Sequence, residues 1–409
     1  MKTTRRFPLI LAVPLALALL VVGCNFQQVA GGPPVSASAS DTPGQGPVSV
    51  TNTAAASEAS ATAAPTATSL PPTPTATPAL TYPVGPDQYP AGVDPLTGLI
   101  VADPSLLNLR PLGIKVSNFP RSARPQAGLS QADLLFEMYT EGGSTRFLAM
   151  YYGRSADKVG PMRSARVEDT RIIPLYDAIL VHVQAFQDVW DQMYASGIDF
   201  INEFPAACPA ICRDPTVTDK VNSAFSNTQA LDAYAKNVRL ETGKPNLAGM
   251  VFDPAPPAKA TPAQGLLVIF SQSARAEWRF DAGSGMYLRY SENDAGAMIP
   301  LDDRTTNKQI AVANAVVLFV PFNRYVGKTT TAEMWDLGLG GSGKAVFFRD
   351  GDVVSGTWKR VNPARPLQFF GSDGQPYALR PGNSWVALIG KSSSAIPSAK
   401  EWTFHMYFP

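Results

Sequence analysis

Basic side chains are concentrated in one short stretch of the sequence. Within 26 residues lie five arginines and one lysine, namely Arg146, Arg154, Lys158, Arg163, Arg166 and Arg171. The planar guanidinium group binds a carboxylate or a phosphate through two parallel hydrogen bonds, so converging arginines suit an anionic ligand. Arg146 follows a Gly-Gly pair that would let a ligand approach backbone donors, and Arg163 and Arg166 would share one face of a helical turn. The pattern therefore predicts an anion-binding site at Arg146, Arg163 and Arg166.

The same arginines have a structural alternative. Acidic residues lie close to them in the sequence, at Glu137, Glu141, Glu168 and Asp169. Ion pairs between the two sets would hold irregular loops together and leave no cation for a ligand. Both interpretations stay open at this point.

A catalytic role would require a general acid or base beside the arginines. The candidate carboxylates are Asp133, Glu137 and Glu141, and the candidate imidazole is His182. His182 lies inside an apolar run, where a lone histidine is more typical of a hydrogen-bonded core residue than of a base. A perturbed acid or base in the same cleft as the arginines would indicate an enzyme, whereas a binding protein needs only the cleft.

Metal and cofactor sites are not indicated. The chain has two histidines, His182 and His405, which excludes a histidine-rich zinc site. Cys208 and Cys212 would supply only half of a metal site. In an oxidising compartment, a loop disulfide between them is the expected use. We therefore predict no metal and no cofactor.

Strands, a hairpin and helices must position the arginines. An apolar strand is predicted at Leu112–Ser117, and strands at 133–139 and 145–152 flank the sequence Glu-Gly-Gly, which is typical of a hairpin. The continuous apolar run at 177–183 suits a central strand buried on both faces. Helices are expected at 187–196 and 227–240, the second with Ser226 or Asn227 as its cap.

The second half of the chain changes to strands, predicted at 266–271, 286–290, 313–320, 345–348, 353–359 and 385–389. Four prolines fall within residues 253–262, and proline lacks the backbone donor that helices and sheets need. The sequence thus predicts an amino-terminal α/β domain at 88–252, a Pro-rich linker at 253–264 and a β-rich carboxy-terminal domain at 265–409. The expected fold class is mixed α+β.

The amino terminus predicts export and lipid anchoring. Lys2, Arg5 and Arg6 precede a 16-residue apolar run, too short for a comfortable transmembrane helix, so residues 1–23 are predicted to be a signal peptide. The run ends in Val-Val-Gly-Cys, which resembles a bacterial lipobox, so Cys24 is expected to be acylated and to hold the protein on the membrane.

A low-complexity segment follows the predicted anchor. Of the 56 residues from 25 to 80, 42 are Ala, Thr, Ser, Pro or Gly. Such a composition cannot bury enough apolar surface to offset chain entropy, so residues 24–87 are expected to be a disordered tether. Without the signal and the tether, 31 basic and 31 acidic residues remain. This balance argues against binding nucleic acid by net charge.

Several longer motifs carry a family resemblance. They are RPL at 110–112, ARPQAGLSQAD at 123–133, EGGSTRF at 141–147, KVGPMRSAR at 158–166 and YDA at 176–178, then FRDG at 348–351, GTWKR at 356–360 and LRPGNSW at 379–385. With them, nearly the whole chain after residue 87 resembles the YerB-like family of bacterial lipoproteins, whose molecular function is unknown. The resemblance implies a lipid-anchored, surface-facing protein whose two parts form a three-layer β/β/α sandwich.

Two stretches depart from the family pattern. After His182 the family tends to have a Gly- and Ser-rich turn, whereas Gln-Ala-Phe follows here, and the family's Pro-His-Asn is Lys-Val-Asn at 220–222. A candidate imidazole of the family is therefore missing from this chain.

Together these patterns predict a noncatalytic lipoprotein of the cell envelope, held by its lipid on the extracytoplasmic face of the membrane. It would bind an anionic or glycan cell-surface component, such as a cell-wall polymer, or an envelope protein. The alternative is a hydrolase or transferase that acts on phosphorylated or glycan envelope polymers, with the arginines and Asp133, Glu137 or Glu141 as its machinery.

Overall fold

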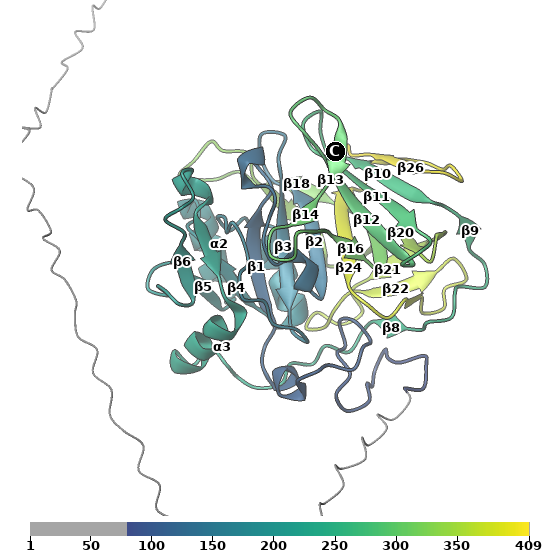
Figure 1. Ribbon diagram of the computed structural model, residues 1–409, viewed down its shortest axis with the longest axis horizontal. Helices are drawn as coiled ribbons and strands as arrows, with labels where there is room; N and C mark the ends of the chain where they lie inside the picture. The colour runs from purple at the N-terminus through teal and green to yellow at the C-terminus, as the bar shows by residue number, and fades with distance from the viewer. Residues whose placement is uncertain (1–79, 409) are drawn as a thin grey trace, which may run out of the picture. The chain divides into compact units, whose positions relative to one another are not determined.

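The computed structural model describes residues 80–408, so the predicted signal peptide, Cys24 and the tether up to residue 79 lie outside the described residues. In the described part, strands dominate and the α-helices are α1 (Asp169–Ile172), α2 (Gln187–Ser196) and α3 (Thr228–Asn237) (Figure 1). Short 3-10 helices join the other elements: η1 (Pro104–Asn108), η2 (Arg121–Ala123), η3 (Leu129–Gln131), η4 (Ile173–Tyr176) and η5 (Lys220–Asn222). The fold is mixed α+β, as the sequence predicts.

An eleven-stranded mixed sheet runs through both halves of the chain. Its strands follow the order β22 (Gln368–Gly371), β21 (Asp352–Lys359), β20 (Ser342–Arg349), β17 (Asn314–Val320), β24 (Ser384–Gly390), β2 (Leu134–Tyr139), β3 (Thr145–Tyr151), β1 (Leu112–Ser117), β4 (Ile179–His182) and β5 (Phe200–Asn202), with β9 (Thr261–Pro262) paired to β21. The two halves meet where β24 lies parallel to β2, with Leu134 opposite Ser384.

A seven-stranded sheet is built from the second half of the chain. Its strands are β13 (Met298–Pro300), β12 (Met286–Glu292), β11 (Arg275–Asp281), β10 (Gly265–Ile269), β26 (Trp402–His405) and β25 (Ser394–Ile396), with β16 (Ala311–Val312) paired to β12. Four two-stranded pieces complete the described part: β14 (Asp302–Asp303) with β15 (Lys308–Gln309), β18 (Phe322–Arg324) with β19 (Trp335–Leu337), β8 (Val251–Phe252) with β23 (Ala378–Leu379), and β6 (Ile211–Arg213) with β7 (Ala224–Ser226).

The predicted hairpin is formed by β2 and β3, which pair antiparallel with Tyr139 opposite Thr145. Every residue of both strands is buried, which explains why apolar residues do not alternate with polar ones; the buried charges within them, Glu137 and Arg146, are both paired. In the turn, Gly142 and Gly143 have φ of 58° and 78°, a backbone conformation that favours glycine.

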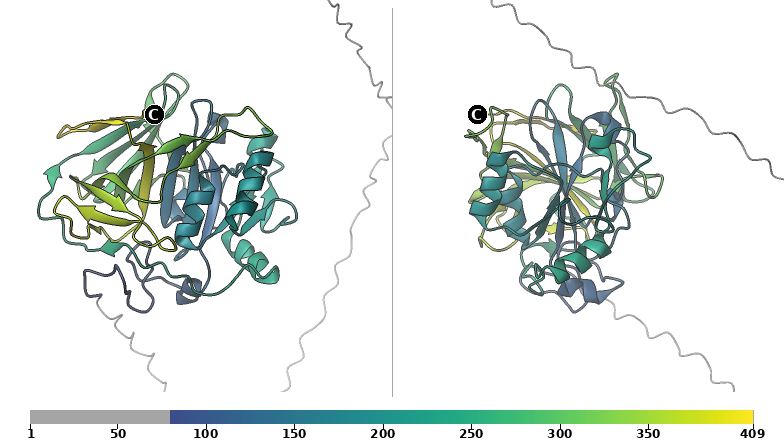
Figure 2. Two further views of the ribbon diagram at one scale, coloured as in Figure 1. Left: turned by 180° about the vertical axis from the view of Figure 1, so that it is seen from behind. Right: turned by 90° about the vertical axis from the view of Figure 1, so that its left-hand side faces the viewer.

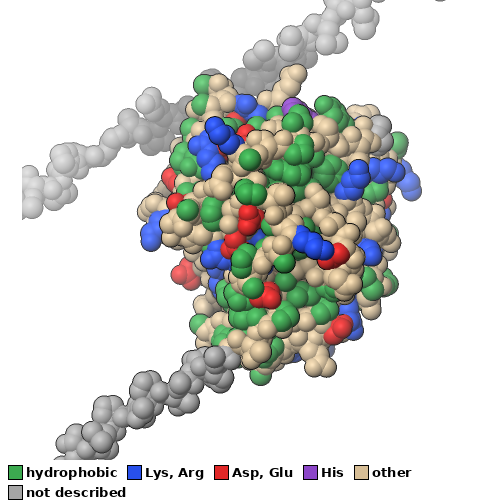
Figure 3. All heavy atoms as spheres, turned by 90° about the vertical axis from the view of Figure 1, so that its right-hand side faces the viewer, with side chains coloured by type: hydrophobic (Ala, Val, Ile, Leu, Met, Phe, Trp, Pro, Cys, Tyr) green, Lys and Arg blue, Asp and Glu red, His purple; other side chains and the backbone are tan. Residues whose placement is uncertain are grey.

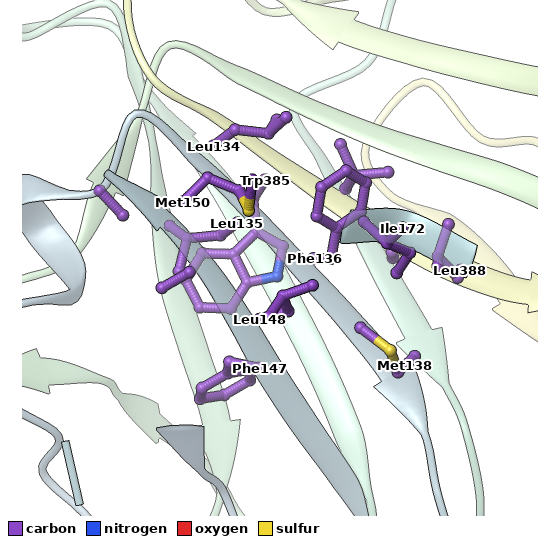
Figure 4. Close-up of a cluster of buried hydrophobic side chains, with 14 of the residues drawn as sticks. Leu134, Leu135, Phe136, Met138, Phe147, Leu148, Met150, Ile172, Trp385 and Leu388 are labelled. Carbon is purple, nitrogen blue, oxygen red and sulfur yellow. The ribbon is translucent and has the colours of Figure 1, made fainter. Parts of the chain in front are cut away.

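The two faces of the central strands have different neighbours. On one face, Phe136 of β2 lies 5.7 Å from Tyr176 of η4, measured between ring centroids. On the other, Trp385 of β24 lies 5.2 Å from Phe147 of β3 and 5.8 Å from Trp278 of β11. Figure 4 shows Phe136, Phe147 and Trp385 within this buried cluster. Helical segments therefore pack on one face and the seven-stranded sheet on the other, while the three-layer sandwich of the whole chain stays a prediction.

A buried ion pair joins the two sheets. Glu137 of β2 and Arg289 of β12 are 1% and 0% exposed, and their side chains meet at 2.9 Å. The guanidinium carbon of Arg289 lies 4.6 Å from the ring centroid of Trp278 and 5.0 Å from that of Trp385. The Glu137 carboxylate also accepts hydrogen bonds from Trp385 Nε1 and Thr145 Oγ1, at 3.2 and 3.1 Å. The Glu137 carboxylate is thus desolvated and well partnered, as a buried charge requires, whereas Arg289 Nε is buried without a hydrogen-bond partner among the described residues.

The Pro-rich segment after β8 is held by one buried arginine. Arg349 of β20 donates hydrogen bonds to the carbonyl oxygens of Asp253 and Ala255, at 2.8 and 3.0 Å. Arg349 is 1% exposed, and its side chain also reaches Asp350 at 2.7 Å. Arg349 thus supplies hydrogen-bond donors to backbone carbonyl oxygens of the Pro-rich segment that do not pair with a neighbouring strand.

One face of the molecule shows mixed charge (Figure 3). On the face that Figure 3 displays, Lys and Arg side chains are scattered among Asp and Glu rather than gathered into one basic area. No helix within residues 80–408 combines the length and apolar character that crossing a membrane requires.

Removing the charge of Glu137 tests how much the two sheets depend on the ion pair. Glu137→Gln keeps the shape of the side chain but leaves the Arg289 cation buried without a counter-charge. We expect the free energy of unfolding to fall by about 3–5 kcal/mol, measured by chemical denaturation. Asp294→Asn, at a carboxylate that is 90% exposed, should change it by less than about 0.5 kcal/mol. Equal losses of unfolding free energy in the two variants would show that the Glu137–Arg289 ion pair does not hold the two sheets together.

Candidate functional site

Two of the three predicted arginines converge on one carboxylate. Glu141 lies in the turn between β2 and β3, and its Oε1 accepts a hydrogen bond from Arg146 of β3 at 2.7 Å. Its Oε2 accepts one from Arg166 Nε at 2.7 Å, and a second guanidinium nitrogen of Arg166 also contacts the carboxylate. Arg166 is 4% exposed, and Phe186 lies over its guanidinium at 5.1 Å. Arg146 and Arg166 therefore form ion pairs with a nearby carboxylate, as the structural alternative to a ligand site predicts.

Arg163 joins the cluster without a carboxylate of its own. It donates to Ser117 Oγ at 3.2 Å and to the Phe119 carbonyl at 3.3 Å, and it forms no salt bridge within residues 80–408. Its side chain is partly exposed; burial lowers its pKa, and the negative charge of Asp219 opposes this more strongly than the positive charge of Arg166 adds to it. It is the member of the cluster that solvent can reach.

The charges of the cluster influence one another. Burial would raise the pKa of Glu141, but the hydrogen bond from Arg166 and the charge of Arg146 outweigh it and lower the pKa to about 2. Burial and the neighbouring Arg166 and Arg163 cations lower the pKa of Arg146 to about 9. Arg146 and Arg166 thus share one ionised carboxylate, while Arg163 has no salt bridge among the described residues and is influenced by the charges of Asp219 and Glu141.

The sequence predicts that a ligand could approach the backbone amides of the Gly-Gly turn, but in the structure both amides already donate hydrogen bonds within the protein. The Gly142 amide donates to Glu333 Oε2 at 2.9 Å, and the Gly143 amide donates to the Tyr139 hydroxyl at 3.0 Å. Ser271 Oγ donates to the Gly143 carbonyl at 2.6 Å. The second half of the chain therefore fixes the turn that carries Glu141, and the backbone donors are already used.

A second ion pair lies beneath the arginines. Lys115 of β1 meets Asp169 of α1 at 2.6 Å, and both side chains are fully buried. The other Asp169 oxygen accepts a hydrogen bond from the Arg166 amide at 2.7 Å. Beside the pair, Glu168 is buried with no hydrogen bond to either carboxylate oxygen from residues 80–408. Burial raises the pKa of Glu168 to about 8, against the influence of the Lys115 charge.

His182 is a core residue. Its Nδ1 lies 2.9 Å from the Gln184 carbonyl, its ring packs 5.1 Å from Trp190, and it is 0% exposed. Burial lowers the pKa of His182 to about 4, so the imidazole is neutral at physiological pH. The segment that replaces the family's Pro-His-Asn is η5, and the charge of its N-cap Asp219 acts on Arg163.

The structure does not bring Asp133 and Glu137 to the arginine cluster. Asp133 lies at the opposite end of the hairpin from Glu141, where it accepts from the Tyr152 and Gly153 amides and from Arg154 Nε, at 2.7, 2.9 and 3.0 Å. Glu137 faces the seven-stranded sheet and holds Arg289. Both carboxylates are buried and serve structural hydrogen bonds. Asp133 lines a cavity with Arg154 and Asp94, but neither Asp133 nor Glu137 lies with Arg146, Arg163 and Arg166.

The remaining basic residues of the stretch are spread over the surface. Arg154 pairs with Asp133, Lys158 with Asp214 at 2.8 Å, and Arg171 with Asp336 at 2.6 Å. Closeness in sequence therefore overstates the cluster, which contains three arginines rather than five.

The predicted disulfide is confirmed. Cys208 and Cys212 are bonded, with 4.6 Å between their Cα atoms. Within residues 80–408, no three His, Cys, Asp or Glu side chains are grouped so that they could hold a metal ion.

The sequence analysis does not predict the buried group formed by Lys115, Glu168 and Asp169. A lysine inside the apolar strand Leu-Gly-Ile-Lys-Val-Ser is a signal for a buried ion pair, because a buried charge needs a partner. The sequence gives no indication that the partner is Asp169 rather than its neighbour Glu168.

These features belong to a chain with recognised relatives. The chain is a member of the family described as "Protein of unknown function (DUF3048)", whose N-terminal domain matches residues 96–241 and whose C-terminal domain matches residues 266–386. The resemblance that the motifs indicate is thereby confirmed.

Two comparisons lead to one relative from Bacillus subtilis. The chain is 27% identical over 314 residues to the protein named "Putative lipoprotein YerB" of strain 168. The matched region covers 75% of this chain and 89% of the relative. It is also similar to the crystal structure of the YerB protein, with a TM-score of 0.63 at 24% identity, over 73% of this chain and 96% of the other. The second likeness shows the fold.

The buried Glu168 makes stability depend on pH with a defined sign. Its folded pKa of about 8 lies above its ordinary value of 4.5, so between these values the folded state keeps a proton that the unfolded state loses. The free energy of unfolding should therefore fall as pH rises through this window, by roughly 1.4 kcal/mol per pH unit. Glu168→Gln cannot ionise and should remove this contribution, so it should be more stable than the wild type at pH 7.5 and similar at pH 4.

Chemical denaturation at several pH values measures this difference. Asp294→Asn, at an exposed carboxylate, should follow the wild-type curve. Parallel curves for Glu168→Gln and the wild type would show that Glu168 ionises in the folded state as it does in the unfolded one.

Proposed function

We propose that this chain is a lipid-anchored protein of the cell envelope that binds an anionic group, a phosphate or carboxylate of a cell-surface component, at Arg146, Arg163 and Arg166. The observation that carries the proposal is that Arg163, partly exposed and without a salt bridge among the described residues, lies beside Arg146 and Arg166, which share the carboxylate of Glu141. In this proposal the protein binds its ligand without changing it.

Access to the cluster supports this proposal. Side-chain exposure is 24% for Glu141 and 10% for Arg146, so an arriving anion meets Glu141 and the partly exposed Arg163 first. The anion would bind beside Glu141 or take its place, because both are acceptors for the same guanidinium groups. Replacing one carboxylate by another conserves the hydrogen bonds on which Arg146 and Arg166 depend.

The perturbed acids and bases nearby favour binding over catalysis. Glu168 and His182 are 1% and 0% exposed, so a substrate at the surface would not touch either group. The residue in place of the family's imidazole, Val221, is exposed and has no titratable group. An envelope hydrolase or transferase would need an acid or base that contacts the ligand.

The lipid anchor rests on the amino-terminal sequence and on the relative's name. The sequence around Cys24 resembles a lipobox, and the relative from Bacillus subtilis is named a lipoprotein. Acyl chains on Cys24, together with the segment that follows, would hold the folded part at the extracytoplasmic face of the membrane.

Arg163→Ala tests the ligand site with the least damage to the fold, because Arg163 makes two long hydrogen bonds and no salt bridge among the described residues. A hydrogen bond to a charged group contributes about 1.5–3 kcal/mol. We expect affinity for tripolyphosphate and for purified anionic cell-wall polymer to fall by about ten- to a hundredfold in calorimetric titrations. The melting temperature should change little.

Two further variants control this experiment. Arg365→Ala removes a partly exposed arginine of a distant loop and should leave affinity unchanged. Glu141→Gln removes the competing charge and should strengthen anion binding while lowering stability. If Arg163→Ala and Arg365→Ala bind equally well, or if Arg163→Ala loses only stability, the arginines are structural and the proposal fails.

Cys24→Ser tests the anchor independently. Without the thiol no diacylglyceryl group can be attached, so the protein should move from the membrane fraction to the soluble fraction of the expressing cells. A variant that stays with the membrane after a wash at high salt would show that something other than the lipid holds it there.

A further inference from the structure

An uncharged aromatic groove lies at the edge of the eleven-stranded sheet, apart from the arginine cluster. It has a volume of about 360 Å³ and lies between α2, the outermost strand β5 and α3, which Figure 1 labels on one side of the molecule and which face the viewer in Figure 2 (right). Its walls include Trp190 and Tyr194 from α2, Phe200 and Asn202 from β5, and Tyr234 from α3. The volume is within the range of small-ligand sites.

The rings of the groove form a connected set. Trp190 and Tyr194 are four residues apart on α2 and stack at 6.2 Å with 25° between their planes. Phe200 meets both edge-on, at 5.4 Å from Trp190 and 5.6 Å from Tyr194. Because each ring is fixed by its neighbours, the groove presents a preformed surface rather than one that must be ordered by a ligand.

Several of these rings are open to solvent. Tyr194 is 68% exposed and Phe204, on the loop after β5, is 73% exposed. Burying such large apolar side chains would stabilise the fold, so their exposure on one groove indicates that they meet something outside the described part of the chain.

Neutral polar atoms also line the groove. Asn202 Oδ1 is buried and accepts no hydrogen bond from residues 80–408. Trp190, Tyr194 and Tyr234 each carry a polar atom at the edge of an aromatic ring. None of the residues that line the groove is charged. The groove thus combines ring faces with neutral donors and acceptors.

We propose that this groove binds the neutral sugar rings of a cell-surface glycan. A pyranose ring has an apolar face of C–H groups and an edge of hydroxyl groups, which match the aromatic faces and the polar atoms described above. A phosphate or an acidic sugar would find no cation among the residues that line the groove, and a lipid chain would offer no partner to the polar atoms of Trp190, Tyr194 and Tyr234. The site goes beyond anion binding at the arginines and shares no residue with it.

Chitotetraose and cellotetraose are suitable probes, because both are neutral chains of β-linked hexoses and they differ in the acetamido group. Binding to the full-length chain in mild detergent is followed by saturation-transfer difference NMR and by calorimetry. We expect saturable binding of at least one probe by the wild type. Tyr194→Ala and Phe204→Ala should each weaken it about tenfold, and both should fold because their side chains are mostly exposed.

Tyr407→Ala is the matched control, since Tyr407 is 52% exposed and follows β26 of the other sheet. It should bind as the wild type does, and Arg163→Ala should also leave oligosaccharide binding intact, which separates this site from the arginines. No saturable binding of either probe, or equal losses in Tyr194→Ala and Tyr407→Ala, would overturn the proposal. A wild-type dimer that Tyr194→Ala dissociates would assign the groove to a second copy of the chain instead.

Discussion

The ion pair between Glu137 and Arg289, enclosed by Trp278 and Trp385, is the interaction on which the rest of the structure depends. Its four side chains come from β2, β12, β11 and β24, so one contact fixes the central strands against the seven-stranded sheet. Thr145 Oγ1, which donates to Glu137, lies at the start of β3. The turn end of the β2–β3 hairpin is thereby held in place, and this end carries Glu141 and Arg146.

A second buried ion pair lies on the opposite face of the central strands. Lys115 and Asp169 form a second buried pair, and Asp169 in turn accepts from the Arg166 amide. Arg166 is therefore positioned from below by a buried carboxylate and from above by Glu141. Two desolvated ion pairs, one on each face of the sheet, therefore support the elements that carry Arg146 and Arg166.

Local patterns in the sequence predict the elements well, because burial and turn chemistry are local properties. Leu112–Ser117 is a strand with the expected bounds, α2 covers the expected residues, and Asn227 caps α3 through its side chain. The strand β11 is missed because Arg275, Glu277 and Arg279 interrupt its apolar pattern. Those charges are compatible with a strand because Glu277 and Arg279 pair with each other across one face.

The partners of buried charges could not be predicted, because they are distant in the chain. Glu137 and Arg289 are 152 residues apart, and Lys115 and Asp169 are 54 apart. For the same reason, Arg154 and Arg171 look like members of the cluster in sequence but pair elsewhere in space. The aromatic groove also escapes a sequence reading, since its rings come from two helices, a strand and a loop.

The central claim is that Arg146, Arg163 and Arg166 receive an anion while the other buried arginines serve the fold. NMR of the arginine Nε–Hε groups tests it most directly, because each guanidinium reports on its own contacts. On titration with tripolyphosphate, the account predicts saturable shifts for Arg163, Arg146 and Arg166 and none for Arg289 or Arg349. Unchanged signals from the three cluster arginines, or shifts of the same size at Arg289, would contradict it.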